Sequence, residues 1–235
     1  MAHNAVMTQD KPPTVTSSFA VPSSAGADLL YTAFKGSLSA VPVVGGTLAE
    51  FMQAFFASPI EKRRDAWMKE VAHALNHLIA NGLTRDSLQA NERFISAVQQ
   101  ASMIAQRTHV KEKLDALRNA LLNIATNRSP DEALESIFLN MIDSFNEWHI
   151  RILHLFQSPS VPGDATELCH VLEHRYPELK GRARVYDVVW RDLSSRELVN
   201  VLSLHGSLQG TGISLLHKRT TELGDLFLQF VAAPS

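Results

Sequence analysis

Two pairs of histidines have the spacing of metal ligands on one helix face. His73 and His77 are four residues apart in the chain, and so are His170 and His174. Zinc proteases hold their metal with histidines at this spacing, and the second pair together with Glu173 matches the HxxEH pattern of one class of them. A catalytic zinc also needs a third protein ligand, for which the sequence offers only nominal candidates. We therefore expect solvent-exposed histidines, with no metal and no cofactor.

Nucleophilic catalysis has one thiol candidate, Cys169, which is the single cysteine of the chain. Its neighbour His170 would point about 100° away from it on a helix, so the two side chains would not form a thiolate–imidazole pair. A buried structural cysteine is the better interpretation. The sequence also lacks the GxSxG, GxGxxG and GxxxxGK[ST] patterns of common hydrolases, dinucleotide-binding enzymes and phosphate-binding loops. We therefore predict that the protein is not an enzyme.

One cluster of basic side chains lies between two expected helices. It could bind an anion or a partner through Arg107, His109, Lys111 and Lys113. Acidic residues in the same region offer partners at helical spacing, so we favour a solvated connection stabilised by ion pairs.

A second basic cluster could contact nucleic acid through Lys180, Arg182 and Arg184. The surrounding residues 173–225 carry eight basic and seven acidic side chains, however. This balance is a poor electrostatic match for a phosphate backbone. We therefore expect protein contacts rather than nucleic-acid binding in this part of the chain.

Helices must position these residues, because apolar side chains recur at helical spacing from residue 30 to residue 152. Ser-Pro pairs at 58–59 and 129–130 each precede a glutamate three residues after the serine, and this pattern predicts two helix starts. One long helix is expected from about residue 137 to residue 158, where the next Ser-Pro pair stands.

An apolar region at residues 29–57 contains an uncharged run, 36–49, which is interrupted by a proline and a pair of glycines. A membrane-active protein could release this region as a hairpin, whereas a helical bundle could bury it as two short helices joined by an elbow. The residues concerned are Val41, Pro42, Val43, Val44, Gly45, Gly46 and Phe51. Large apolar residues on stripes, with polar residues between them, favour the buried hairpin, with a helix that restarts at Thr47.

Three parts are expected along the chain: a flexible leader at 1–24, a helical bundle at 25–158 and a C-terminal unit at 164–235. Proline and glycine at 158–163 mark the boundary between the last two. The C-terminal unit has two short helices, glycine-punctuated apolar pieces at 200–218 that suit a β-hairpin, and a closing helix. The predicted fold class is mainly α, a helical bundle followed by a small winged-helix-like α+β unit.

The composition of the chain narrows the types of protein to which it can belong. The chain has 235 residues, of which 45% are hydrophobic and 20% are charged, and these values are typical of a globular protein. Its formal net charge of −2 gives no general attraction to nucleic acid or to an acidic membrane. One cysteine allows no internal disulfide, and no apolar run reaches the length of a transmembrane helix. We expect a cytoplasmic protein.

Three segments carry a resemblance to known proteins: PVVGGTLAE at 42–50, EKRRDAW at 61–67 and TELGDLFL at 221–228. They resemble bacterial helical proteins of uncharacterised function. Among named families they are similar to the abortive-infection alpha (Abi-alpha) group, which pairs an N-terminal helical part with a Thr-x-Leu-Gly type of ending. The resemblance implies a role in phage defence, and it transfers no catalytic residue.

These observations together predict a non-enzymatic interaction or regulatory module. Its expected partner is a protein, and a second copy of the chain in a homodimer is one candidate. Two alternatives stay open. One is a membrane-disrupting effector that releases residues 29–57 on activation, and the other is a DNA-binding regulator that uses the C-terminal unit.

Overall fold

The computed structural model describes residues 46–160, 165–206 and 215–234, with side chains described from Ile60 onward. Within these ranges the chain is mainly helical and has no strand, which confirms the predicted helical class. The first five helices are α2 (Gly46–Ala80), α3 (Arg85–Gln89), α4 (Glu92–Arg107), α5 (Lys111–Ala125) and α6 (Glu132–Ser144). They are followed by α7 (Glu147–Gln157), α8 (Leu168–Arg175), the 3₁₀ turn η1 (Pro177–Leu179), α9 (Ala183–Ser195) and α10 (Glu222–Val231).

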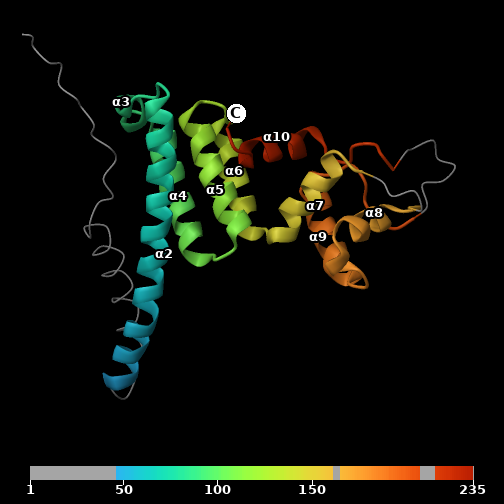
Figure 1. The fold of residues 1–235 in the computed structure, drawn as a ribbon, viewed down its shortest axis with the longest axis horizontal. Coiled ribbons are helices and arrows are strands. Elements are labelled where there is room, and N and C mark those ends of the chain that lie inside the picture. Colours follow the sequence, from blue (N-terminus) through green and yellow to red (C-terminus); the bar gives the residue numbers. More distant parts are fainter. Residues whose placement is uncertain (1–45, 161–164, 207–214, 235) are drawn as a thin grey trace, which may run out of the picture.

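Helices α2, α4, α5 and α6 lie side by side as a bundle (Figure 1). Helix α4 contacts the other three, and α5 packs against α2 and α6 as well. Each helix turns an apolar stripe inward, as Trp67, Val71 and Leu75 do on α2, because residues three or four apart share one helix face. Leu117 and Leu121 of α5 are fully buried at the centre of this bundle.

Helix α10 joins the bundle to the part of the chain that follows it. The chain leaves the bundle through α7, which packs against α9, and α10 returns to contact both α5 and α7 (Figure 1). Phe227 and Phe230 of α10 pack on Phe138 of α6, with ring centres 5.4 and 5.5 Å apart. Buried Asn123 of α5 donates hydrogen bonds to the last backbone carbonyls of α10. One apolar core thus runs from α2 to α10, and the domain division at 158–164 stays a prediction.

Helix α2 begins at Gly46, one residue before the predicted restart at Thr47, and continues through Pro59. The predicted helix start at Ser58 is therefore wrong. A proline inside a helix cannot donate its backbone hydrogen bond, which costs about 3 kcal/mol. Alanine, glutamate, lysine and arginine residues flank Pro59, and their strong helix preference outweighs this one missing bond.

The long helix predicted over 137–158 is also wrong, because α6 and α7 are separate helices that meet at Phe145 and Asn146. The Asn146 side chain accepts a hydrogen bond from the Trp148 N–H, at 2.9 Å. The Asn146 N–H in turn donates to Nδ1 of His149, at 3.1 Å. This is a capping box in which histidine replaces the usual glutamate, and it starts a new helix in a different direction.

The second Ser-Pro pair also lies outside its predicted helix. Asp131, not Ser129, caps α6, and its carboxylate accepts hydrogen bonds from the N–H groups of Ala133 and Leu134. Ser129 instead donates to the buried carboxylate of Glu135. The capping position moves by two residues because a carboxylate accepts both N–H groups at once.

Several predictions fall on residues that the structure does not describe. The leader at 1–24 and Val41, Pro42, Val43, Val44 and Gly45 lie outside the described residues. The hairpin expected at 200–218 lies partly outside them. Within the described part, Val199 and Thr220 form an isolated antiparallel bridge, so a winged-helix β unit is not shown.

Candidate functional site

The first predicted basic cluster surrounds the turn between α4 and α5. Arg107 forms an ion pair with Asp143 of α6, at 2.8 Å. Lys113 is buried, and its ammonium group donates to the backbone oxygen of Asp143, at 2.7 Å. Burial lowers the pKa of Lys113, although the Asp143 carboxylate acts against this effect. Both side chains therefore hold α4 and α5 to the end of α6.

The other two members of that cluster face solvent. Lys111 forms an ion pair with Asp115 one turn later in α5, at 2.9 Å, and His109 is exposed in the turn. The four predicted residues lie in one region, but three of their cationic groups already have acidic or carbonyl partners. This arrangement suits a stabilised connection between helices better than an anion site.

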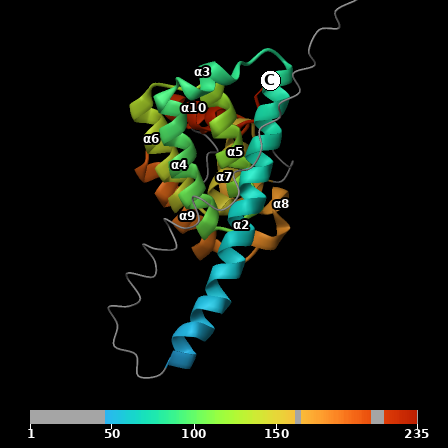
Figure 2. The same cartoon turned by 90° about the vertical axis from the view of Figure 1, so that its left-hand side faces the viewer.

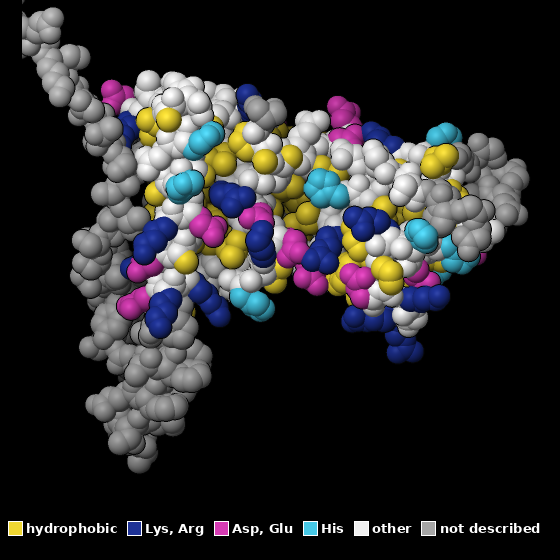
Figure 3. Space-filling view, in the orientation of Figure 1, with side chains coloured by type: hydrophobic (Ala, Val, Ile, Leu, Met, Phe, Trp, Pro, Cys, Tyr) yellow, Lys and Arg dark blue, Asp and Glu magenta, His cyan; other side chains and the backbone are white. Residues whose placement is uncertain are grey.

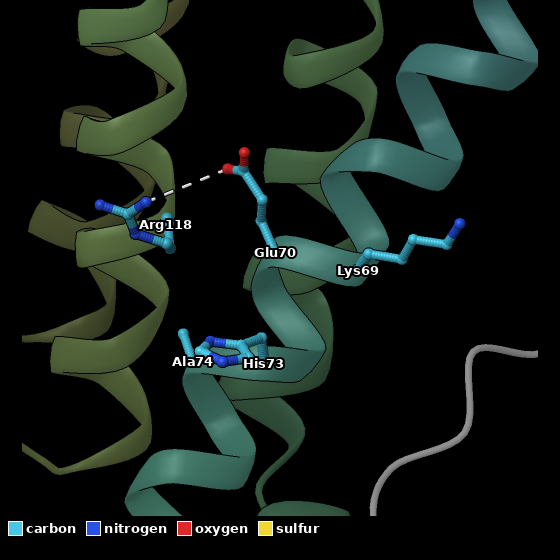
Figure 4. A pocket seen from close by; sticks show the side chains of 5 residues that line it. All are labelled: Lys69, Glu70, His73, Ala74 and Arg118. Atoms are coloured by element: carbon cyan, nitrogen blue, oxygen red, sulfur yellow. Dashed lines mark ion pairs between the residues drawn. The ribbon is translucent and has the colours of Figure 1, made fainter.

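A shallow groove of about 530 Å³ lies between α2 and α5 (Figure 4). It is lined by Lys69, Glu70, His73 and Ala74 of α2 and by Arg118 of α5. Glu70 points toward Arg118, at 4.0 Å, whereas Lys69 points away from it (Figure 4). Ligand pockets are usually enclosed and apolar, whereas this groove is open and carries both charges. It therefore suits the polar rim of a protein contact.

The second basic cluster lies at the junction between η1 and α9. Lys180, Arg182 and Arg184 are exposed there, and Lys and Arg side chains gather on that end of the molecule (Figure 3). None of the three side chains forms an ion pair with the described residues. Gly181 between them has a φ of +74°, a conformation that favours glycine and turns the chain into α9.

The buried thiol lies at the start of α8. Cys169 donates a hydrogen bond to the carboxylate of Glu167, at 3.3 Å. Burial, together with this hydrogen bond, raises the pKa of Cys169 to about 11. A thiol with this pKa stays protonated at neutral pH, so it is a poor nucleophile, in agreement with the sequence interpretation.

Metal-ligating side chains meet around Cys169 in a different set from the predicted histidine pairs. Ligand atoms of Glu167, Cys169 and His170 lie within 4.8 Å of one another, which makes this the only such group in the described part of the chain. His174 does not belong to it. Next to the group, His205 lies 3.9 Å from Glu167 and 2.8 Å from Asp187.

Sequence reasoning missed Glu167, Asp187 and His205. The run Glu-x-Cys-His at 167–170 is a local signal that could have identified Glu167. No spacing rule connects His205 to it, because the two are brought together only by the return of the chain after α9. A backbone hydrogen bond from Cys169 to the oxygen of Leu204, at 3.0 Å, holds this return segment in place.

A buried histidine and a half-buried aspartate also face each other between α7 and α9. Nε2 of His149 lies 3.1 Å from a carboxylate oxygen of Asp192, and Arg196 binds the other oxygen of Asp192 at 3.0 Å. Burial lowers the pKa of His149, although Asp192 acts against this effect. Because Nδ1 of His149 caps α7, both ring nitrogens are already used. The pair fixes the angle between two helices.

None of the described helices is long and apolar enough to cross a lipid bilayer. Comparison of the chain with protein-family models, with curated proteins and with solved structures finds no match to any of them. The function is therefore inferred from the residues and geometry of the chain itself.

Proposed function

We propose that the protein acts by binding a protein partner rather than by catalysis, and that it binds through the first turns of α2. The observation that carries this proposal is the length of α2. From Trp67 onward the helix packs against α4 and α5, whereas its first turns extend well beyond the other helices (Figures 1 and 2). We call residues 46–58 the projecting segment.

The sequence of the projecting segment favours contact with another helix. It contains three phenylalanines, a leucine and a methionine, with a single charged residue, Glu50. Phe51 and Phe55 are four residues apart, the spacing of neighbouring anchors on one helix face. Amphipathic helices bind partners through apolar anchors at this spacing.

A second copy of the chain is the partner that we propose. A two-fold axis would place the projecting segment of one copy against that of the other in opposite directions, so that each copy supplies the same apolar anchors to the contact. The groove between α2 and α5 would then lie at the rim of this contact.

Two side chains that could take part in catalysis, Cys169 and His149, support the proposal that the protein acts by binding. The thiol of Cys169 is held protonated, and both ring nitrogens of His149 serve structural hydrogen bonds. A winged-helix-like arrangement of the C-terminal part and a role in phage defence, which the Abi-alpha resemblance implies, belong to the same proposal.

Self-association tests the proposal directly. We expect the full chain to be a dimer by light scattering coupled to gel filtration, and Phe51→Ser with Phe55→Ser to be a monomer with unchanged helical circular dichroism. Gln53→Ser in the same segment is the matched control and should remain dimeric. A wild-type chain that is monomeric up to its solubility limit would overturn the proposal, as would a double variant that stays dimeric.

A further inference from the structure

The start of α8 brings together three kinds of metal-ligating atom. Glu167 offers a carboxylate oxygen, Cys169 a sulfur and His170 an imidazole nitrogen, all within 4.8 Å of one another. In a tetrahedral zinc site the ligand atoms lie roughly 3.3–3.6 Å apart, as follows from zinc–ligand bonds of roughly 2.0–2.3 Å. The Cys169 sulfur and the Glu167 oxygen, at 3.3 Å, already have this separation. A movement of the His170 side chain would bring its ring nitrogen to the same separation from the other two ligand atoms.

The backbone explains why these three side chains converge. Glu167 is the extended residue that precedes α8, with φ −134° and ψ 159°. Cys169 and His170 follow in the first helical turn. The change from extended to helical backbone turns the Glu167 side chain back toward this turn, and its carboxylate accepts the hydrogen bond from the thiol.

His205 lies beside Glu167, although it comes from a distant part of the chain. Its Nε2 lies 2.8 Å from the Asp187 carboxylate, so the ring proton belongs on Nε2 and the lone pair on Nδ1. Nδ1 lies 3.9 Å from an oxygen of Glu167, but His205 is not among the three residues whose ligand atoms all lie within 4.8 Å of one another, so its ring must move toward them to bind the same ion. Histidines that bind metals usually donate their other ring N–H to a carboxylate, which fixes the ring and raises its basicity. Asp187 gives His205 this arrangement.

Burial and access also fit a bound ion. The Cys169 side chain is buried, which shields a metal–thiolate bond from solvent, whereas His170 is exposed and leaves a route for the ion from solvent. Sulfur and imidazole donors together with one carboxylate select zinc over magnesium and calcium, which prefer oxygen ligands.

We propose that Glu167, Cys169, His170 and His205 bind one zinc ion, and that the Cys169 thiol releases its proton to solvent as the zinc–sulfur bond forms. Four protein ligands leave no open position, so the site is structural rather than catalytic. The ion joins the start of α8 to the segment around Leu204 and His205, which is otherwise held there by the hydrogen bond from Cys169 to Leu204. This inference does not depend on the proposed contact through α2.

Cobalt is the probe for this site, because Co²⁺ in a tetrahedral site with a thiolate ligand absorbs both in the visible range and in the near ultraviolet. Full-length, untagged protein freed of metal by chelation would be titrated with Co²⁺ and then with Zn²⁺. We expect one equivalent of Co²⁺ to give both absorption bands and one equivalent of Zn²⁺ to remove them. Zinc should also raise the melting temperature.

Variants separate this site from the histidine pair of the HxxEH pattern. Cys169→Ser should lose the near-ultraviolet band, and His170→Ala and His205→Ala should weaken binding strongly. Asp187→Asn should weaken it about tenfold or more, as expected for a residue that orients a metal-bound histidine. His174→Ala is the matched control on α8 and should bind Co²⁺ as the wild type does.

Three results would overturn the proposal: no cobalt spectrum with the wild-type protein, an unchanged spectrum with Cys169→Ser, or a loss of binding with His174→Ala. Circular dichroism of each metal-free variant checks its fold. His170 is exposed, so its replacement tests the site even if a change at the buried Cys169 unfolds the protein.

Discussion

Replacement of Gly224 by alanine should destabilise the protein, although the same change in most helices stabilises them. Gly224 lies in the first turn of α10, where its N–H donates to the capping hydroxyl of Thr221, at 3.0 Å. A Cβ atom at this position would lie far inside 3.0 Å of the backbone oxygen of Leu198 and 3.3 Å from the Cβ of Thr220. The φ of Gly224 is not in the left-handed range, so the backbone conformation alone would accept another residue. Glycine is required here by the close approach of two backbones.

The expected size follows from two opposing effects. Alanine favours a helix over glycine by about 1 kcal/mol. Overpacking costs about 1–3 kcal/mol, and the upper part of that range applies here because backbone atoms cannot rotate away as a side chain does. The free energy of unfolding should therefore fall by about 2 kcal/mol, which lowers the melting temperature by about 4–8 °C in a chain of this size.

Urea unfolding followed by circular dichroism measures this change. Gln229→Ala, on an exposed position of α10, is the matched control and should stay within about 0.5 kcal/mol of the wild type. A Gly224→Ala protein as stable as the wild type, or more stable, would refute the close approach of α10 to Leu198.

Three further predictions concern the core and the dependence of stability on pH. Phe227→Ala should lower the free energy of unfolding by about 3–5 kcal/mol, because the ring is fully buried against Phe138, and urea unfolding will show whether Phe227→Leu recovers most of the loss. His149 has a lowered pKa, so the unfolded chain binds its proton first on acidification. The wild type should therefore lose stability as the pH falls below about 6.5. Urea midpoints of His149→Gln measured across this range should show a smaller loss, and the remainder comes in part from His154, whose pKa burial also lowers. For Asp225, burial raises the pKa, but hydrogen bonds, of which that from Lys218 is the strongest, bring it below its ordinary value. The stabilisation by Asp225 should be complete above about pH 3.9 and disappear as the pH falls through the lowered pKa. In an acid titration, Asp225→Asn should therefore lose less stability than the wild type does.

The apolar stripes could be predicted from the sequence, whereas several helix boundaries could not. Leu117 and Leu121, or Phe227 and Phe230, are spaced for one helix face whatever surrounds them, so their burial follows from local pattern. The break at Asn146 depends on a histidine in the place of the usual capping glutamate. Capping rules based on glutamate and glutamine do not recognise it.

The candidate metal site shows even more clearly that local sequence patterns do not predict every feature of the structure. Spacing rules drew attention to His170 and His174, which share a helix, but the structure groups His170 with Glu167 and Cys169 instead. His205 lies next to Glu167 of this group, although the two residues are more than thirty positions apart in the chain. Such contacts depend on the folded path of the backbone, which the spacing of residues along the sequence does not reveal.

The return of α10 to α5 also bears on the order in which the chain folds. Asn119 and Asn123 of α5 bind the end of α10 across more than one hundred residues of intervening chain. Contacts between residues so distant in sequence form late, because a long loop must close first, whereas α2 and α4–α6 can pair with near neighbours. A bundle that has formed without α10 would still present the apolar surface around Phe138. This intermediate, and any native molecule in which α10 detaches, would be the species most prone to aggregate.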